Sequence, residues 1–564
     1  MDSESSKTVI GHIIDVQGTT LTATLVEDEQ GQVPTVTIGD EDITVGQIGS
    51  YVAVRQNEVH LVAIVTRMTE QEALAAPTIE TPGDHTARLP FAKRIARLTP
   101  IGSIRSDRAF DRGIGSYPTT GAEVHALGTV EIAKLFERFY SKGFAVGTVA
   151  THPALRVCLE PSNLFGRHSA ILGQTGSGKS WTVASLVQKT IEVMSKAHII
   201  ILDLHGEYCW RQDDGTCYYA FPDPAVRHVD ACDLEIPYWL MTYAELVDLL
   251  IERSEREATN QTAFFRDCLL EGRQSENATA TPALGLARVT VDTPIFFSLD
   301  AILDKVRAKN IERVGNRQGP MFGDFDRFLM RIESKLNDTR YDFLLKPKIR
   351  STSASLSSLL RDFVGLGDRK VPVTVIDLSS VPFDVRPTVA AQIGRLAFEF
   401  NYWNPQYREF PVLLICEEAH VYIPRAAENQ FAGSRKSMER IAKEGRKYGV
   451  GLSAVSQRPH EVSETVLAQC GTFICLRITN PDDQSYIRSL VPESEGDLVS
   501  VLAGLGRGEA LVLGEAVPIP TRIVFDKPRP VPNSDDVDFY NKWRTGPDDL
   551  DVDAIVRRWR SQER

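Results

Sequence analysis

The sequence lacks the features that mark membrane and secreted proteins. Its 564 residues contain no apolar run near the ~18 residues that a membrane-spanning helix needs. The first residues, MDSESSKTVIGH, have neither the basic nor the apolar region of a signal peptide. We therefore expect a cytoplasmic protein with no membrane partner.

Cysteine and histidine are present, but not in the patterns that bind metals or form disulfides. The eight cysteines include no C-x-x-C pair, and the 11 histidines include no H-x-x-x-H pair. We expect neither a zinc site nor a disulfide framework. The cysteines fit small apolar residues of a reducing compartment.

Positive charge is also scarce, since the net charge is −12. This argues against a surface that coats DNA generally, although a local basic surface can coexist with an acidic exterior. Residues 1–60 hold ten Asp or Glu against two Lys or Arg. That region is either a docking surface for a basic partner or a solvated exterior.

A phosphate-binding motif is what the sequence does contain. Residues 173–180 read GQTGSGKS, after the apolar run AIL and before a segment with helical spacing. This is the strand, glycine loop and helix of a P-loop, in which Gly173, Gln174, Thr175, Gly176, Ser177 and Gly178 turn backbone N–H groups toward phosphates. Lys179 reaches the β/γ oxygens, and the Ser180 hydroxyl ligates Mg²⁺ at a helix N-terminus that favours anions.

The chain before the P-loop is rich in β-strand patterns. Short strand-like segments separated by turn residues predict a small barrel or sandwich in residues 1–70, and residues 71–90 read as a linker. Strand character returns at RIARLTPIGSI, VHALGTVEIA and FAVGTVA, which we expect to complete the barrel. The first domain is therefore predicted to span residues 1–160.

The chain after the P-loop alternates buried strands and helices, the pattern of a parallel α/β core. Charged segments with helical periodicity interrupt it, and GTFICLRIT, GEALVLG and IPTRIVF are expected to add edge strands. The tail ends in a short basic helix. The fold class is thus multidomain α/β: a P-loop core in two parts, residues 161–232 and 352–527, with a helical bundle insertion at 233–351 and an extended tail at 528–564.

Acidic side chains follow two apolar strands of this core. Asp203 and Glu207 follow IIIL, and Glu417 and Glu418 follow VLLIC. A P-loop ATPase needs one carboxylate for the Mg²⁺ shell and another to activate the attacking water, and Glu417 and Glu418 can supply both. Asp203 and Glu207 are either ligand-site residues or turn residues that cap the next element.

Polar and basic residues follow in the next part of the core. Gln457 ends a strand, where its amide either positions water or is simply satisfied at the strand end. Residues 425–447 hold seven basic residues against three acidic ones. They indicate contact with DNA phosphates, an arginine finger at Arg446, or a solvated helix with i,i+4 pairs. The candidate DNA contacts are Arg435, Lys436, Arg440 and Lys443.

The order of these motifs resembles one family. HSAILGQTGSGKS, LDLHGEY, LLICEEAH, IAKEGRKYGVGLSAVSQRP, LAQC and GLGRGEALVLGEAVPIPTR occur in the order found in the HerA branch of the FtsK/HerA ATPases. The resemblance implies a RecA-like ATPase core, an N-terminal HAS barrel and a helical bundle, and it spans nearly the whole chain.

The resemblance also implies roles for individual residues. Lys179 and Ser180 would bind ATP phosphates and Mg²⁺, Glu417 would hold Mg²⁺, Glu418 would activate water, and Arg446 resembles the family's trans-acting arginine. Arg167, Asp203 and Glu207 match positions lining the nucleotide site. Many relatives have Asp then Glu where this chain has Glu417 then Glu418, so the division of roles between these two stays open.

The family further implies a homohexamer with double-stranded DNA in its central channel. It implies an effector docked on the barrel, a NurA-type nuclease or a sirtuin-like or other defence enzyme, in DNA end processing or antiphage defence. An alternative is an ATP-gated ring scaffold that activates an effector with little translocation of its own. A P-loop NTPase acting on protein substrates is a third possibility.

Overall fold

A computed structural model describes residues 8–18, 20–26, 35–38, 41–44, 47–56, 59–72, 92–105, 110–211, 216–230, 233, 235–252, 254–280, 283–383, 385–426 and 432–561. The predicted linker at 71–90 lies almost wholly outside these residues. The chain forms two compact units. The first comprises Met1–Val193, Ser456–His460 and Cys470–Pro528, and the second comprises Met194–Val455, Glu461–Gln469 and Arg529–Arg564.

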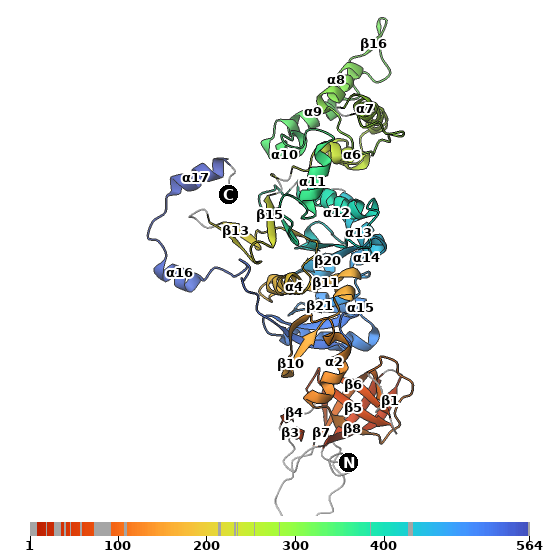
Figure 1. Cartoon of the computed structure of the whole chain (residues 1–564), viewed down its shortest axis with the longest axis vertical. Coiled ribbons are helices and arrows are strands. Elements are labelled where there is room, and N and C mark those ends of the chain that lie inside the picture. The colour runs from red at the N-terminus through yellow and green to blue at the C-terminus, as the bar shows by residue number, and fades with distance from the viewer. Residues whose placement is uncertain are drawn as a thin grey trace, which may run out of the picture. The chain divides into compact units, whose positions relative to one another are not determined.

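The predicted small barrel is confirmed in the first unit (Figure 1). Alternation of apolar and polar residues directs one face of each strand inward, as in β2, whose Leu21 and Ala23 are buried. Six strands close in the order β1-β2-β7-β6-β5-β8. Their bounds are β1 Val9–Gln17, β2 Thr20–Leu25, β5 Tyr51–Gln56, β6 Val59–Glu72, β7 Ala92–Arg105 and β8 Glu123–Ala126, with a separate hairpin of β3 Thr35–Ile38 and β4 Glu41–Thr44.

Two of the three segments expected to complete the barrel do so, as β7 and β8, whereas the assignment of the third was wrong. VHALGTVEIA forms only the short strand β8 and then enters helix α2 (Thr129–Tyr140), whose buried residues Ile132, Leu135, Phe136 and Phe139 follow helical spacing. FAVGTVA forms β9 (Ala145–Val149), which pairs with β10 (His152–Cys158) and with β23 rather than with a barrel strand. A local strand pattern does not specify which sheet receives the strand.

The first unit also carries a run of sheet strands that leads to the P-loop. The order is β10-β9-β23-β22-β21-β11, with β11 Ser169–Leu172, β21 Thr472–Cys475, β22 Glu509–Gly514 and β23 Thr521–Phe525. β11 and β21 are parallel, whereas the remaining pairs are antiparallel. Since each of β21, β22 and β23 has a neighbour on both sides, the expectation that they are edge strands was wrong.

Parallel strands form the sheet of the second unit. The order is β20-β19-β12-β18-β15, with β12 Ile199–Asp203, β15 Val226–Asp230, β18 Val373–Asp377, β19 Val412–Cys416 and β20 Val450–Ser456. Every residue of β12 and β19 is buried, as expected for strands covered on both faces. Helices α12 (Arg386–Tyr402) and α13 (Ala432–Glu444) pack closely. Gly394 allows this approach, since a Cβ there would lie 2.8 Å from Met438 Cε. The predicted alternation of strands and helices is confirmed.

The predicted helical insertion is also confirmed in the second unit (Figure 1). Its helices are α6 Tyr243–Leu250, α7 Ala258–Thr279, α8 Leu299–Asn310, α9 Asp326–Leu336, α10 Asp342–Leu345 and α11 Ser355–Phe363. Thr242 and Glu245 form a reciprocal capping box at the start of α6. Arg273 is fully buried, where its guanidinium donates to the carbonyls of Trp239 and Met241 at 3.2 and 3.1 Å, and this burial lowers its pKa to about 10.

The C-terminal tail, residues 528–561, contains two helices rather than the single one expected. They are α16 Phe539–Thr545 and α17 Val552–Ser561. Asn533 N donates to the carbonyl of Glu207 at 2.8 Å, which attaches the tail to the loop after β12. Large apolar side chains along the tail are exposed, with Trp543 at 82% and Trp559 at 75%. Across the described ranges, no helix combines the length and apolar character needed to cross a membrane.

Candidate nucleotide-binding and hydrolysis site

The P-loop of the first unit has the local structure that its sequence predicts. β11 is buried along its whole length, and the loop that follows leads directly into α4 (Lys179–Val193). Gly176 and Gly178 have φ angles of 74° and 103°, a region of backbone space that favours glycine. These two glycines let the loop turn back over the start of α4, where backbone N–H groups attract anions.

Hydrogen bonds within the loop fix its shape. The Gln174 carbonyl accepts from Ser177 Oγ at 2.6 Å and from Lys179 Nζ at 3.4 Å. The Gln174 side chain accepts from Thr479 Oγ1 at 2.8 Å, which ties the loop to the segment after β21. Ser177 is fully buried and Lys179 is 8% exposed. The lysine ammonium is therefore held across the loop instead of extending into solvent.

A turn at Gly508 packs against the P-loop. Gly508 N donates to the Ser177 carbonyl at 3.0 Å. A Cβ on Gly178 would lie 3.0 Å from Gly508 N, closer than nearly all real contacts. Gly178 is thus required both by its positive φ and by the close approach of this turn, which the motif GLGRGEALVLG supplies.

Gln457 lies against the P-loop. Thr175 Oγ1 donates to Gln457 Oε1 at 2.5 Å, and Gly173 N donates to the carbonyl of Ser456 at 3.2 Å. The structure therefore brings Gln457 to the phosphate loop, as expected for a polar residue at the end of β20. An amide in this position can respond to the terminal phosphate or to a water beside it.

Arg167 lies at the other end of β11 from the P-loop. It precedes the strand, pairs with Glu515 through a short ion pair, and accepts a backbone hydrogen bond from Gly471 N at 2.8 Å. The four residues of β11 separate it from the loop by about 13 Å at ~3.3 Å per residue. The structure does not bring Arg167 to the P-loop of its own chain.

Asp203 organises the loop that follows β12 in the second unit. Only 1% of its surface is exposed. Its Oδ1 accepts from the backbone N–H groups of Gly206 and Glu207 at 2.9 and 3.1 Å, and its Oδ2 accepts from Tyr208 N at 2.9 Å. Burial raises the pKa of Asp203 to about 6, although the backbone hydrogen bonds act in the opposite direction and lower it. Asp203 therefore caps this turn, while its assignment to the ligand site stays a prediction.

Glu417 is a buried carboxylate at the end of β19. The Tyr208 hydroxyl donates a short hydrogen bond to Glu417 Oε1, and the Tyr422 hydroxyl donates to the Glu417 carbonyl. Burial, reinforced by the charge of Glu207, raises the pKa of Glu417 well above its usual range. A cation beside such a group favours its charged form strongly. The loop after β12 therefore supports Glu417 through Tyr208.

Glu418 has a strained backbone. Its φ and ψ are both 47°, in the left-handed region that non-glycine residues avoid at a cost of about 1–2 kcal/mol. The Glu418 carboxylate lies 3.3 Å from His420 Nδ1. This sharp turn places two successive carboxylates in different surroundings, since Glu417 is 6% exposed and Glu418 is only partly buried. Such strain is common at functional sites.

Arg446 differs from the paired basic residues of its segment, as do the exposed Lys436 and Lys447. It is exposed in a short 3-10 turn, Gly445–Tyr448, between α13 and β20, and no ion pair joins it to any described residue. By contrast, Arg435 bonds Glu439 at 2.7 Å, and Lys443 lies 3.6 Å from the same carboxylate. Arg440 stacks on Phe398 at 4.2 Å, while Lys436 is exposed. The i,i+4 pairs of a solvated helix are therefore present in the candidate DNA segment.

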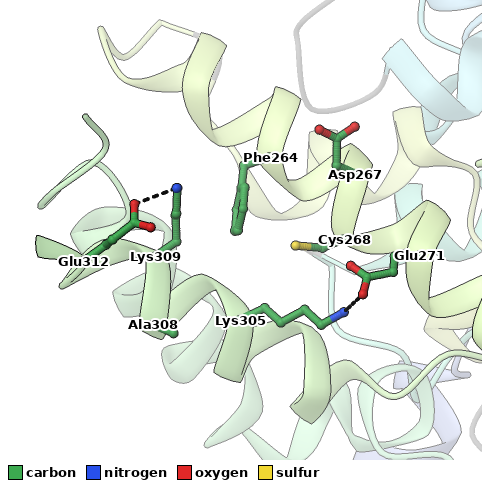
Figure 2. Close-up of a pocket in the computed structure, with 8 residues that line it drawn as sticks. All are labelled: Phe264, Asp267, Cys268, Glu271, Lys305, Ala308, Lys309 and Glu312. Carbon is green, nitrogen blue, oxygen red and sulfur yellow. Dashed lines mark hydrogen bonds and ion pairs between the residues drawn. The ribbon is translucent and has the colours of Figure 1, made fainter. Parts of the chain in front are cut away.

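The helical insertion contains a cleft of about 320 Å³ between α7 and α8 (Figure 2). Phe264 and Cys268 face it from α7. Its two lysines are already paired, Lys305 with Glu271 at 2.8 Å and Lys309 with Glu312 at 2.6 Å (Figure 2). Because both positive charges are neutralised locally, this cleft is a poor site for phosphate.

The sequence reasoning missed Tyr208 and Tyr422, the two phenols that hold Glu417. Tyr208 is the final letter of LDLHGEY, so its place in that motif was the available signal. No group of three or more His, Cys, Asp or Glu in the described part of the chain could hold a metal. Mg²⁺ is commonly held by only one or two protein oxygens together with phosphates and waters, and the Ser180 hydroxyl and Glu417 carboxylate are ligands of that type.

Two family models and the curated relatives identify one family. Residues 144–397 match the family model "Helicase HerA, central domain", and residues 408–523 match "Helicase HerA-like C-terminal". The chain is 28% identical to the DNA double-strand break repair helicase HerA of Pyrococcus furiosus, over 68% of this chain and 69% of that protein. It is 25% identical to the HerA of Sulfolobus acidocaldarius, over 78% and 80%. VirB4 of Thermoanaerobacter pseudethanolicus superposes with a TM-score of 0.44 at 16% identity, over 68% of this chain and 96% of that one.

Proposed function

Because this chain belongs to the HerA helicase family, we propose that it is a ring-shaped motor that hydrolyses ATP to move along double-stranded DNA. The chain is an enzyme of the P-loop ATPase and helicase class. The proposal rests on the hydrogen bonds of the P-loop. Lys179 Nζ donates to the Gln174 carbonyl across the loop, and Thr175 Oγ1 donates to Gln457. A loop with these contacts is suited to bind a triphosphate and to sense its terminal phosphate.

In the proposed reaction, residues 173–180 bind the phosphates of ATP. Backbone N–H groups of the loop hold the α- and β-phosphates, and the Lys179 ammonium pairs with the β- and γ-oxygens. Ser180 and Glu417 would hold Mg²⁺, which neutralises charge on the phosphate oxygens when bound. Tyr208 orients the Glu417 carboxylate through its hydroxyl hydrogen bond.

Glu418 is the proposed general base. It accepts a proton from the water that attacks the γ-phosphate, and Gln457 orients that water through its amide. The strained backbone of Glu418 supports this division of roles over the reverse, because strain of this kind is common at functional sites. Asp203 shapes the neighbouring loop, and Glu207 contributes charge there.

We further propose that six copies form the ring and that Arg446 acts on the ATP of a neighbouring copy. An exposed arginine on a short, well-positioned turn has the properties of an arginine finger, which stabilises the charge of the transition state. Arg167, which is distant from its own P-loop, is proposed to serve the same kind of interface.

Double-stranded DNA would occupy the channel of the ring. Lys436, Arg440, Arg435 and Lys443 are the candidate phosphate contacts. An effector, a NurA-type nuclease or a defence enzyme, would dock on the N-terminal barrel. The competing proposal is an ATP-gated scaffold with little translocation, and the internal ion pairs of Arg435 and Lys443 favour it.

The test is the ATPase rate of the full chain with and without linear double-stranded DNA, at two salt concentrations. The motor proposal expects stimulation that falls as salt rises, because salt weakens phosphate contacts. A rate indifferent to DNA at both salt concentrations would reject the motor and support the scaffold. Glu418→Gln serves as the blank for contaminating ATPases.

A further inference from the structure

An aromatic and cationic cluster adjoins the P-loop. Trp181 directly follows Ser180 in the first turn of α4 and is partly buried. The Arg507 guanidinium carbon lies 4.1 Å from the centre of its indole ring, and the Lys527 ammonium lies 4.8 Å from it. The indole Nε1 is buried and donates to none of the described residues.

The same backbone turn that supports the P-loop positions this cluster. Arg507 precedes Gly508, whose N–H bonds the Ser177 carbonyl at 3.0 Å and whose carbonyl accepts from Phe525 N at 2.9 Å. Lys527 follows two residues after Phe525. A Cβ on Gly178 would lie 3.7 Å from Arg507 Cγ. Main-chain hydrogen bonds therefore hold the backbone that carries these cations close to the phosphate loop.

Two carboxylates close to the cluster in the sequence pair with other arginines. Asp526, beside Lys527 in the sequence, bonds both terminal nitrogens of Arg156 at 2.7 and 2.5 Å. Glu509, two residues after Arg507, bonds Arg522 at 2.6 Å. The Arg507 and Lys527 side chains are both exposed. This edge of the P-loop thus combines two accessible cations with an aromatic ring.

We propose that Trp181, Arg507 and Lys527 bind the nucleoside monophosphate half of ATP, an inference that rests on the proposed function. In a P-loop the lysine reaches the β- and γ-phosphates, so the chain just beyond Ser180 adjoins the α-phosphate, from which the sugar and base continue. An indole ring stacks on nucleobases, and cations bind phosphate. ATP carries both groups that the cluster binds, whereas inorganic triphosphate carries no base.

The experiment compares the binding of ATP and of inorganic triphosphate to the full chain by calorimetry. Trp181→Leu is expected to raise the Kd for ATP by roughly 5- to 100-fold, because base stacking on an aromatic side chain is lost. The Kd for triphosphate should stay unchanged, which also shows that the P-loop is folded. Trp181→Phe should restore most of the ATP affinity, and Trp403→Leu, at an exposed tryptophan on another element, should change neither Kd.

Two outcomes separate the inference from the proposed function. Equal loss of ATP and triphosphate affinity in Trp181→Leu, or no loss of either, would overturn the inference while leaving ATP binding intact in the parent chain. Failure of the parent chain to bind both ligands would overturn the proposed function itself. Arg507→Gln and Lys527→Gln are expected to weaken ATP binding in a salt-dependent manner, and insensitivity of both variants would also count against the cluster.

Discussion

The P-loop of the first unit and the acidic cluster of the second unit are built in opposite ways. The P-loop presents backbone groups, and its shape depends on Gly176 and Gly178 at positive φ. The acidic cluster presents side chains, and its carboxylates at Asp203 and Glu417 are 1% and 6% exposed. A site made of backbone groups can be recognised from a short contiguous sequence motif. A site made of buried side chains depends on partner residues that lie far apart in the sequence.

Lys179→Ala should have the largest effect, and it tests whether the P-loop binds phosphate. We expect kcat/KM for ATP to fall about 10⁴-fold, because a charged contact to the phosphates is lost in both binding and reaction. Isothermal titration with ATP should show no measurable binding. Lys189→Ala, at a partly buried lysine of the same helix that pairs with Glu192, is the matched control and should bind normally. Unimpaired ATP binding by Lys179→Ala would remove this loop as the phosphate site.

Glu418→Gln tests the acidic side. The amide keeps the size of the side chain but cannot accept a proton, so we expect kcat to fall about 10³-fold while ATP binding is retained. Single-turnover hydrolysis and equilibrium binding separate the two effects. Glu409→Gln, at an exposed glutamate just before β19, should turn over normally. Normal turnover by Glu418→Gln would reassign the base to another residue.

The buried state of Asp203 predicts a dependence of stability on pH. Its pKa is about 6 in the folded chain against an ordinary value of 3.8, so folding favours its protonated form. This contribution is complete below pH 4 and is lost as pH rises through 6. A shift of one unit corresponds to about 1.4 kcal/mol, so the total is about 3 kcal/mol.

The measurement is the difference in unfolding free energy between the parent and Asp203→Asn, followed from pH 4 to pH 7 by urea denaturation with hydrogen exchange of β12. The parent should lose about 2 kcal/mol relative to the variant across this range, because the carboxyl is already partly ionised at pH 4 in the unfolded chain. A difference that stays constant with pH would mean that Asp203 titrates alike in both states.

Tyr208→Phe should give the smallest effect, and it tests how far the acidic cluster depends on a partner distant in the sequence. The variant removes only the hydroxyl that orients Glu417. We expect the Mg²⁺ concentration for half-maximal ATPase to rise about 10-fold, with kcat recovered at saturating Mg²⁺. Tyr238→Phe removes another buried phenol, which bonds the Phe297 carbonyl, and should leave the Mg²⁺ requirement unchanged. A lower kcat at every Mg²⁺ concentration would point to a different role for Tyr208.

The sequence predicted where helices and strands form better than it predicted which of them pair or make contact. The P-loop, β12, β19, β20 and the helical insertion follow from local apolar periodicity and from glycine spacing. The pairing of β9 with β23, the addition of β15, and the contact of Tyr208 with Glu417 depend on residues far apart in the chain, so no local pattern encodes them. The left-handed backbone of Glu418 was equally hidden, because glutamate has no preference for it. The domain boundaries and the roles of the site residues stay predictions.

The exposed side chains of the C-terminal tail have an energetic consequence for every measurement on this protein. Eight large apolar or aromatic residues between Val537 and Trp559 face water. Burying one such side chain contributes about 1.5–3 kcal/mol, so covering the tail would release on the order of 10 kcal/mol before the entropic cost of ordering it. Any species that covers the tail in the folded state raises the apparent stability by mass action. Wherever such a species is present, the Tm of this protein depends on its concentration as well as on the chain.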